Sequence, residues 1–143
     1  WELNVAQVMV EDWAKAGIRA KIQTMPSSVF WDQWTDFPFS LTGWGHRPLA
    51  PMVLALAYRT GAPWNESSFS NAEFDDLLTE VNGTIDPVKR TDITGKLMEI
   101  MRESGPITQP FFMQVATAYN KRVKGFEMHP TKYIFFDQMA VES

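Results

Sequence analysis

The sequence of 143 residues contains no cysteine and only two histidines, at positions 46 and 129. The lack of cysteine excludes a disulfide framework, a thiolate nucleophile and a thiolate metal site. It leaves the compartment open, although it suits an extracytoplasmic protein. Two histidines far apart in the sequence make a dedicated metal site improbable. We therefore expect neither a metal nor a cofactor.

Long apolar runs and clusters of positive charge are also missing. No window approaches the roughly 18 consecutive apolar residues that a membrane-spanning helix needs. The 13 lysines and arginines are scattered, and the net charge is −4, so we expect no nucleic-acid partner. With 45% hydrophobic and 21% charged residues, the composition is that of one globular domain.

The motifs of common catalytic sites are absent as well. The sequence has no Gly-x-Ser-x-Gly, no glycine-rich phosphate loop and no histidine beside a plausible serine nucleophile. Asp75 and Asp76 form an acidic pair, but in the first turn of a helix they complement the helix dipole. We therefore predict that the chain is not an enzyme.

The chain starts at Trp1 without an initiator methionine or a signal peptide, and a helical pattern begins almost at once. Apolar residues recur on one helical face, with Gly17 at the expected end: Leu3, Ala6, Val10 and Trp13. We expect a piece of a longer protein, whose targeting signal lies outside this segment.

The next segments alternate between strand and helix patterns. Ile18 to Gln23 and Phe37 to Thr42 show the two-residue period of half-buried strands. Between them, Ser27 or Ser28 can cap a short helix that holds Trp31. The order helix, strand, helix, strand favours a parallel α/β sheet with right-handed crossovers. For the whole chain we expect an α/β fold with a mixed sheet flanked by helices.

The second half contains two well-marked helices. A short buried helix is expected over Met52 to Tyr58, before these two helices. Ser70 and Glu73 form a capping box for a helix that ends at Gly83. Asp86 and Pro87 start another, which ends at Gly105. Further strands are predicted over 107–118 and near 123–126, whereas 133–141 is ambiguous.

The strand end from Gly43 to Arg47 is the strongest candidate binding site. Gly43 and Gly45 flank Trp44, and His46 and Arg47 follow. An aromatic plate beside a fixed positive charge at a strand end is typical of a small-ligand site. The alternative is that Trp44 belongs to the core and that Arg47 is solvated.

Taken in order, several short segments resemble the C-terminal part of family-5 solute-binding proteins, the extracytoplasmic receptors of ABC importers for peptides and nickel complexes. These segments are 12–18, 42–45, 69–78, Asp86-Pro87 with Arg90, 105–107 and 123–126. None is strong alone, but their order and spacing match over nearly the whole chain.

The resemblance implies that residues 1–143 form part of one lobe of a two-lobed fold of the periplasmic-binding-protein type (type II, cluster C). Residues from about 120 to 143 would return to the other lobe. The implied partners are a small solute, the membrane subunits of an ABC permease and the missing N-terminal lobe of the same protein. Without that lobe, we expect Tyr133, Ile134, Phe135 and Phe136 to be exposed, which favours self-association.

Carried over by position, Trp44 and Gly45 match a strand end that lines the ligand cleft of the family. Peptide-binding members often place an aspartate where this sequence has Arg47, so the charge is reversed. A guanidinium favours a carboxylate, a phosphate or a sugar acid, and we expect an anionic or zwitterionic solute. The alternative is that Arg47 pairs with a carboxylate of the missing lobe.

Other candidate ligand contacts lie nearby. His46, Met25, Ser28, Trp31 and Asn65 are predicted to line or approach the cleft. For Trp31, and for Trp34 on the same short helix, a place in the core is the alternative.

These observations predict a solute-binding receptor component of an ABC importer, located in the periplasm or on the outer side of the membrane. It would capture a peptide-like or anionic solute by lobe closure. The alternative is a non-catalytic structural or interaction module. A ligand-dependent change in fluorescence would distinguish the two.

Overall fold

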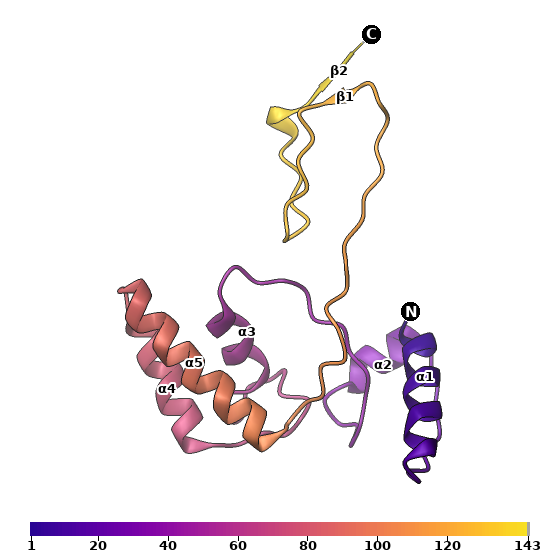
Figure 1. Cartoon of the computed structure of the whole chain (residues 1–143), viewed down its shortest axis with the longest axis vertical. Coiled ribbons are helices and arrows are strands. Elements are labelled where there is room, and N and C mark those ends of the chain that lie inside the picture. The colour runs from indigo at the N-terminus through magenta and orange to yellow at the C-terminus, as the bar shows by residue number, and fades with distance from the viewer. Residues whose placement is uncertain (143) are drawn as a thin grey trace.

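The computed structural model describes residues 1–142 and is mostly helical. Figure 1 shows five α-helices, a long connecting segment and a small C-terminal unit. The helices are α1 (Glu2–Lys15), α2 (Ser27–Gln33), α3 (Ala50–Ala57), α4 (Ala72–Gly83) and α5 (Pro87–Ser104). The C-terminal unit holds β1 (Val123–Lys124), the 3-10 helix η1 (Phe136–Gln138) and β2 (Ala140–Val141). No helix of residues 1–142 is both long and apolar enough to cross a membrane.

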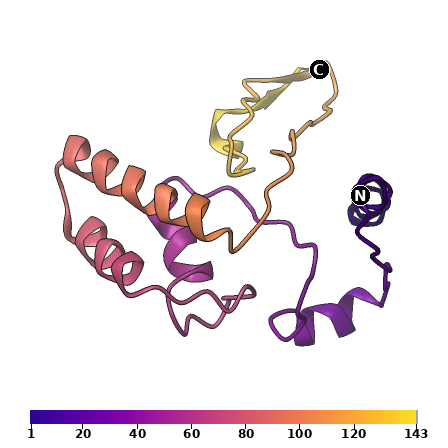
Figure 2. The same cartoon turned by 60° about the horizontal axis from the view of Figure 1, so that its bottom comes forward.

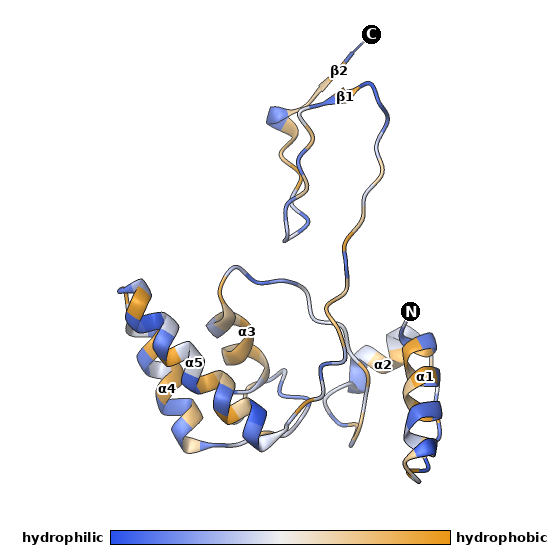
Figure 3. Cartoon of the chain, viewed as in Figure 1, coloured by the Kyte–Doolittle hydropathy of each residue, from blue (hydrophilic) through white to orange (hydrophobic). Residues whose placement is uncertain are grey.

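The hydrophobic core lies between α3, α4 and α5. Phe74, Leu78, Ile93 and Leu97 are almost completely buried, and Leu54 of α3 joins them. The buried residues of α4 and α5 recur every three or four positions, so each helix turns one apolar face inward. In Figure 3, α3 is apolar along its length, whereas α4 and α5 alternate between apolar and polar residues. The two predicted helices of the second half and the short buried helix are therefore confirmed.

Most helix ends follow the sequence, with two corrections. Asp86 caps α5 by accepting a hydrogen bond from the Lys89 backbone N–H at 2.8 Å, and Gly105 ends it in the left-handed conformation at φ 57°. The predicted cap of α4 is wrong: Asn71, not Ser70, accepts from the backbone N–H of Phe74, at 3.0 Å. The Ser70 hydroxyl instead accepts from Thr60, across the preceding loop.

The cap expected from Ser27 or Ser28 for α2 is also absent, because both serines lie inside the helix and Pro26 precedes it. The first helix ends as expected, with Gly17 at φ 81°. Its apolar face is only half-buried, because none of its residues reaches the core.

The predicted mixed sheet is not present within residues 1–142. The segments 18–23, 37–42 and 107–118 lie outside any strand, and the sheet of the described chain is the antiparallel pair of β1 and β2. A strand exists only with a neighbour that takes up its backbone hydrogen bonds. An alternating pattern predicts which side chains a strand would bury, but it cannot supply that neighbour.

The C-terminal unit stands apart from the helices, at the end of a drawn-out segment (Figures 1 and 2). Val123 pairs with Val141, and Lys124 with Ala140. Within it, Tyr133, Ile134, Phe135 and Phe136 are all exposed, as the sequence analysis predicted.

Candidate functional site

Four tryptophans surround a surface hollow of about 310 Å³, here called the tryptophan hollow. Trp31 and Trp34 come from α2 and its end, Trp44 from the segment before α3, and Trp64 from the loop before α4. Trp34, Trp44 and Trp64 are mutual neighbours, with ring centroids 6.0–6.4 Å apart. Trp31 lies 5.6 Å from Trp34. The remaining lining residues are Thr42, Gly43, Gly45 and Arg47.

The position of Trp44 is fixed from two sides. Its ring packs against the hydrophobic core, so this wall of the hollow is continuous with the folded body. Its indole nitrogen donates a hydrogen bond to Oε1 of Glu66 at 2.9 Å. Trp44 therefore both packs against the core and lines the hollow.

Glu66 joins the segment 40–44 to the loop before α4. Its carboxylate accepts hydrogen bonds from the Thr42 hydroxyl at 2.8 Å, from Trp44 and, at 3.4 Å, from Ser40. The carboxylate is half-buried, so these donors replace water that it has lost. Three donors from one segment hold that segment against the loop.

The negative charge of Glu66 also affects a buried residue of the core, Tyr58. Tyr58, at the end of α3, is only 5% exposed. Burial raises the pKa of Tyr58 to about 12, and the nearby negative charge of Glu66 adds to this rise. The carboxylate therefore accepts hydrogen bonds from the segment 40–44 and acts electrostatically on Tyr58 at the end of α3.

Arg47 lies at the edge of the hollow, with its guanidinium folded toward the backbone. Its Nη1 donates to the carbonyl oxygens of His46 and Gly45, at 3.2 and 3.3 Å. These contacts hold the group beside Trp44 while engaging one of its nitrogens. The other guanidinium N–H groups give Arg47 the geometry to bind an anion.

The sequence-predicted site residues fall into two groups. Trp31, Trp44, Gly45 and Arg47 are brought together at the tryptophan hollow. The others lie outside its lining: His46, Met25, Ser28 and Asn65. For all eight, contact with a ligand stays a prediction.

Asn65 has its side-chain amide fully engaged in its own loop. Its Nδ2 donates to the backbone carbonyls of Phe69 at 2.7 Å and Arg59 at 3.2 Å. Its Oδ1 accepts from the backbone N–H of Phe69 and the hydroxyl of Ser67, both at 3.1 Å. These bonds shape the loop that presents Trp64 and Glu66.

Glu66 and Thr42 were not predicted as site residues from the sequence. A single glutamate in a polar loop carries no pattern that singles it out, and its partners lie 22 to 26 positions earlier. Thr42 was assigned only to a strand. Its contact with Glu66 depends on how the loop folds back, which periodicity cannot show.

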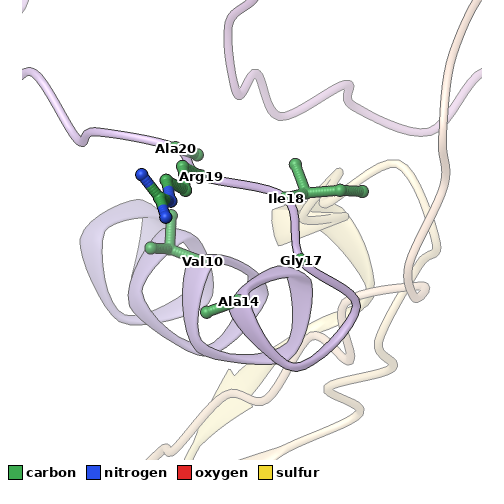
Figure 4. Close-up of a pocket in the computed structure, with 6 residues that line it drawn as sticks. All are labelled: Val10, Ala14, Gly17, Ile18, Arg19 and Ala20. Atoms are coloured by element: carbon green, nitrogen blue, oxygen red, sulfur yellow. The ribbon is translucent and has the colours of Figure 1, made fainter.

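A second hollow, of about 400 Å³, lies between α1 and the turn that follows it (Figure 4). Its lining is small and apolar apart from one guanidinium: Val10, Ala14, Gly17, Ile18, Arg19 and Ala20. Few polar groups converge there, so it lacks the chemistry that fixes a ligand's orientation. In residues 1–142, no group of three or more His, Asp or Glu side chains is arranged to hold a metal ion.

No protein-family model matches the chain. It is 25% identical over 120 residues to the dipeptide-binding protein DppE of Bacillus subtilis, covering 82% of this chain. It is 26% identical over 152 aligned positions to the di/tripeptide-binding protein 1 of Pseudomonas aeruginosa, covering 96%. The nickel-binding protein NikA of Staphylococcus aureus is 23% identical, covering 94%.

The chain is a distant homologue of part of a family-5 solute-binding protein. It spans only about a quarter of these relatives, from 22% to 28% of their length. They are named as binding proteins, in agreement with the prediction that the chain is not an enzyme.

The fold agrees with this relationship. The structure of HbpA2 from Haemophilus parasuis superposes with a TM-score of 0.71 at 23% identity. The match covers 98% of this chain and 29% of that protein. The arrangement of helices and extended segments is thus that of a part of HbpA2.

Proposed function

We propose that this chain is part of the C-terminal lobe of an extracytoplasmic receptor that captures a small solute for an ABC importer. In this proposal, residues 1–143 form the lobe segment, and residues from about 120 onward return to the other lobe. The extended segments 18–23, 37–42 and 107–118 become strands of a mixed sheet once the rest of the protein supplies their neighbours. The support is the distant relationship to dipeptide-, di/tripeptide- and nickel-binding proteins over most of the chain.

The observation that carries the proposal is the tryptophan hollow with Arg47 at its edge. Residues from α2, the segment 42–47 and the loop before α4 converge there, which is how a binding site is built from several elements. Its wall is held by the core and by Glu66, so it is preformed rather than assembled by the ligand.

The solute would bind between two lobes, and closure would present the complex to the permease. Closure is driven only by the solute's stronger binding to the closed form. We propose a peptide-like or anionic solute, because a guanidinium beside the hollow favours a carboxylate or phosphate.

The test is a titration followed by tryptophan fluorescence, with dipeptides, sugar acids and nickel complexes as solutes. Saturable binding of an anionic solute that Arg47→Asp abolishes is the expected result. If the unmodified protein and Arg47→Asp bind the solute equally, the receptor function is supported but Arg47 is not part of the binding site. No response to any solute would favour a structural or interaction module instead.

A further inference from the structure

The relative orientation of the tryptophan rings indicates which kind of ligand the hollow can hold. Trp34, Trp44 and Trp64 form a triangle in which each ring is inclined to the others by 58–65°. No two of these rings stack face to face, so the ring faces stay available for contact with a ligand. Trp31 and Trp64, which are 51% and 45% exposed, leave much of their ring surface open to solvent. The rings therefore act as walls around a common space.

The charge at the hollow has one sign. Arg47 is the only ionised side chain among the residues that line it. Glu66 stands behind the wall, where Trp44, Thr42 and Ser40 occupy its carboxylate. An anion entering the hollow therefore meets the guanidinium of Arg47, whereas the Glu66 carboxylate does not line the hollow and directs its oxygens toward donors in the wall.

This charge decides between two classes of ring ligand. The faces of indole rings attract cations, and an aromatic enclosure alone would favour an ammonium group. Arg47 opposes that choice, because its positive charge is held beside Trp44 by two backbone carbonyls. A negative group on the ligand turns the same charge into a favourable contact.

The size of the hollow suits a small ring compound. An apolar cavity of about 150 Å³ holds benzene. The tryptophan hollow, at about 310 Å³, has room for one ring together with a polar substituent.

We infer that the tryptophan hollow binds a flat ring that carries an anionic group. The ring lies against the indoles of Trp44 and Trp64, and the anion meets the guanidinium of Arg47. This inference rests on the proposed function, since it names the class of solute that the same site takes.

The test measures the affinity of the full 143-residue chain for simple probes by ligand-observed NMR, which detects millimolar binding. Phenylacetate carries both features of the inferred ligand. Phenethylamine reverses its charge, cyclohexylacetate replaces the flat ring by a puckered one, and acetate lacks a ring. Trialanine represents a peptide without a ring.

We expect phenylacetate to bind about tenfold more tightly than phenethylamine or acetate. We expect it to bind about fivefold more tightly than cyclohexylacetate, since inclined or offset contacts between flat rings add to simple apolar burial. Trp64→Leu and Arg47→Gln should each weaken phenylacetate binding by about three- to tenfold. Trp64→Phe should restore part of the loss.

Phe112→Leu is the matched control for Trp64→Leu, because Phe112 is an aromatic residue outside the hollow and 85% exposed. It should leave binding unchanged. Equal loss in this variant would overturn the assignment of the site.

Other outcomes separate the inference from the proposed function. Phenethylamine binding as tightly as phenylacetate would overturn the anionic class, and cyclohexylacetate binding as tightly would overturn the flat ring. Binding of trialanine without binding of phenylacetate would reject a ring compound as the solute and would agree with the proposed receptor function. Binding of none of the five probes would reject the inferred class of solute, whereas the proposed function is decided by the separate titration with dipeptides, sugar acids and nickel complexes.

Discussion

The helical body, formed by α3, α4 and α5, and the C-terminal unit differ in how far each buries its own apolar side chains. All buried residues of the described chain lie between Pro51 and Met101, whereas residues 123–142 contain none. α4 and α5 complete their backbone hydrogen bonds internally and bury one face against each other. The C-terminal unit contains a pair of two-residue strands and exposes Tyr133, Phe135 and Phe136.

The difference teaches which parts of such a chain are self-sufficient. A helix needs only a partner for its apolar stripe, and α3, α4 and α5 supply that to one another. A strand needs a neighbour along its whole length. Segments with strand patterns therefore depend on residues elsewhere, and the tryptophan hollow lies where the two kinds of segment meet.

The largest expected effect comes from the core of the helical body. Phe74→Ala removes a ring that is 0% exposed, and the cavity should lower the free energy of unfolding by about 3–5 kcal/mol. Urea unfolding followed by circular dichroism measures it. Ile85→Ala, at a side chain 92% exposed, is the control and should change stability by less than about 0.5 kcal/mol. A small loss for Phe74→Ala would mean that this core does not hold the helices together.

A second substitution, Gly125→Ala, should destabilise the C-terminal unit without changing the stability of the helical body. Gly125 has φ 74°, and a Cβ there would overlap the backbone carbonyl of Gln138. Gly125→Ala should destabilise the pairing of β1 with β2 by about 1–3 kcal/mol. Hydrogen exchange of the Glu142 amide, which donates to the Arg122 carbonyl, should then accelerate.

The control for Gly125→Ala is Gly83→Ala, where a Cβ meets no atom within 4 Å. It should leave the exchange of the Glu142 amide unchanged. If Gly125→Ala also lowered the unfolding midpoint of α4 and α5, the two regions would not be independent.

A smaller effect tests the start of α4. Asn71→Ala removes the side chain that accepts from the Phe74 backbone and should cost about 1 kcal/mol. Ser70→Ala, one position earlier, should cost clearly less. The ratio of the two losses in urea unfolding decides between the caps, and a larger loss for Ser70→Ala would favour the capping box predicted from the sequence.

A further prediction concerns the dependence of stability on pH. The pKa of Tyr58 is raised in the folded protein from 10.0 to about 12, so the protein holds the neutral phenol more strongly than the unfolded chain does. The resulting stabilisation is fully present below pH 10 and is lost as the pH rises toward about 12. Tyr58→Phe should remove this part of the pH dependence, as measured by urea unfolding on both sides of pH 10.

Glu66→Gln sharpens the same measurement. It should lower the pKa of Tyr58 but keep it above 10.0, because burial is the larger cause and remains. Ultraviolet titration of tyrosinate, with Tyr58→Phe as reference, gives the value. An unchanged pKa in Glu66→Gln would show that the carboxylate is not coupled to the core.

The sequence predicted the parts of this fold that depend on local chemistry. Asp86 and Gly105 bound α5 because capping and a left-handed glycine are properties of a few adjacent residues. It failed where a distant partner decides the outcome. The segment 37–42 has a strand pattern but no neighbour in the described chain, and the donors to Glu66 come from another loop. At the cap of α4, Ser70 and Asn71 were both suitable, and the bond from Thr60 to Ser70 favours Asn71.

The candidate site divides in the same way. Trp44, Gly45 and Arg47 stood out because they follow one another in the sequence. Thr42 is tied to the hollow through its hydrogen bond to Glu66, in the loop that Asn65 shapes, and no local pattern predicts that bond.

The most direct test of the account is an NMR titration that observes the indole N–H signals of a ¹⁵N-labelled chain. All six tryptophans report: four line the tryptophan hollow, and Trp1 and Trp13 lie outside it on or beside α1. With an anionic solute that binds, the account predicts large saturable shifts of Trp31, Trp34, Trp44 and Trp64, while Trp13 stays in place. Trp1, whose ring lies against Gly43 of the lining, should shift less than these four. Shifts confined to Trp1 and Trp13, or equal shifts of all six, would contradict a binding site at the hollow.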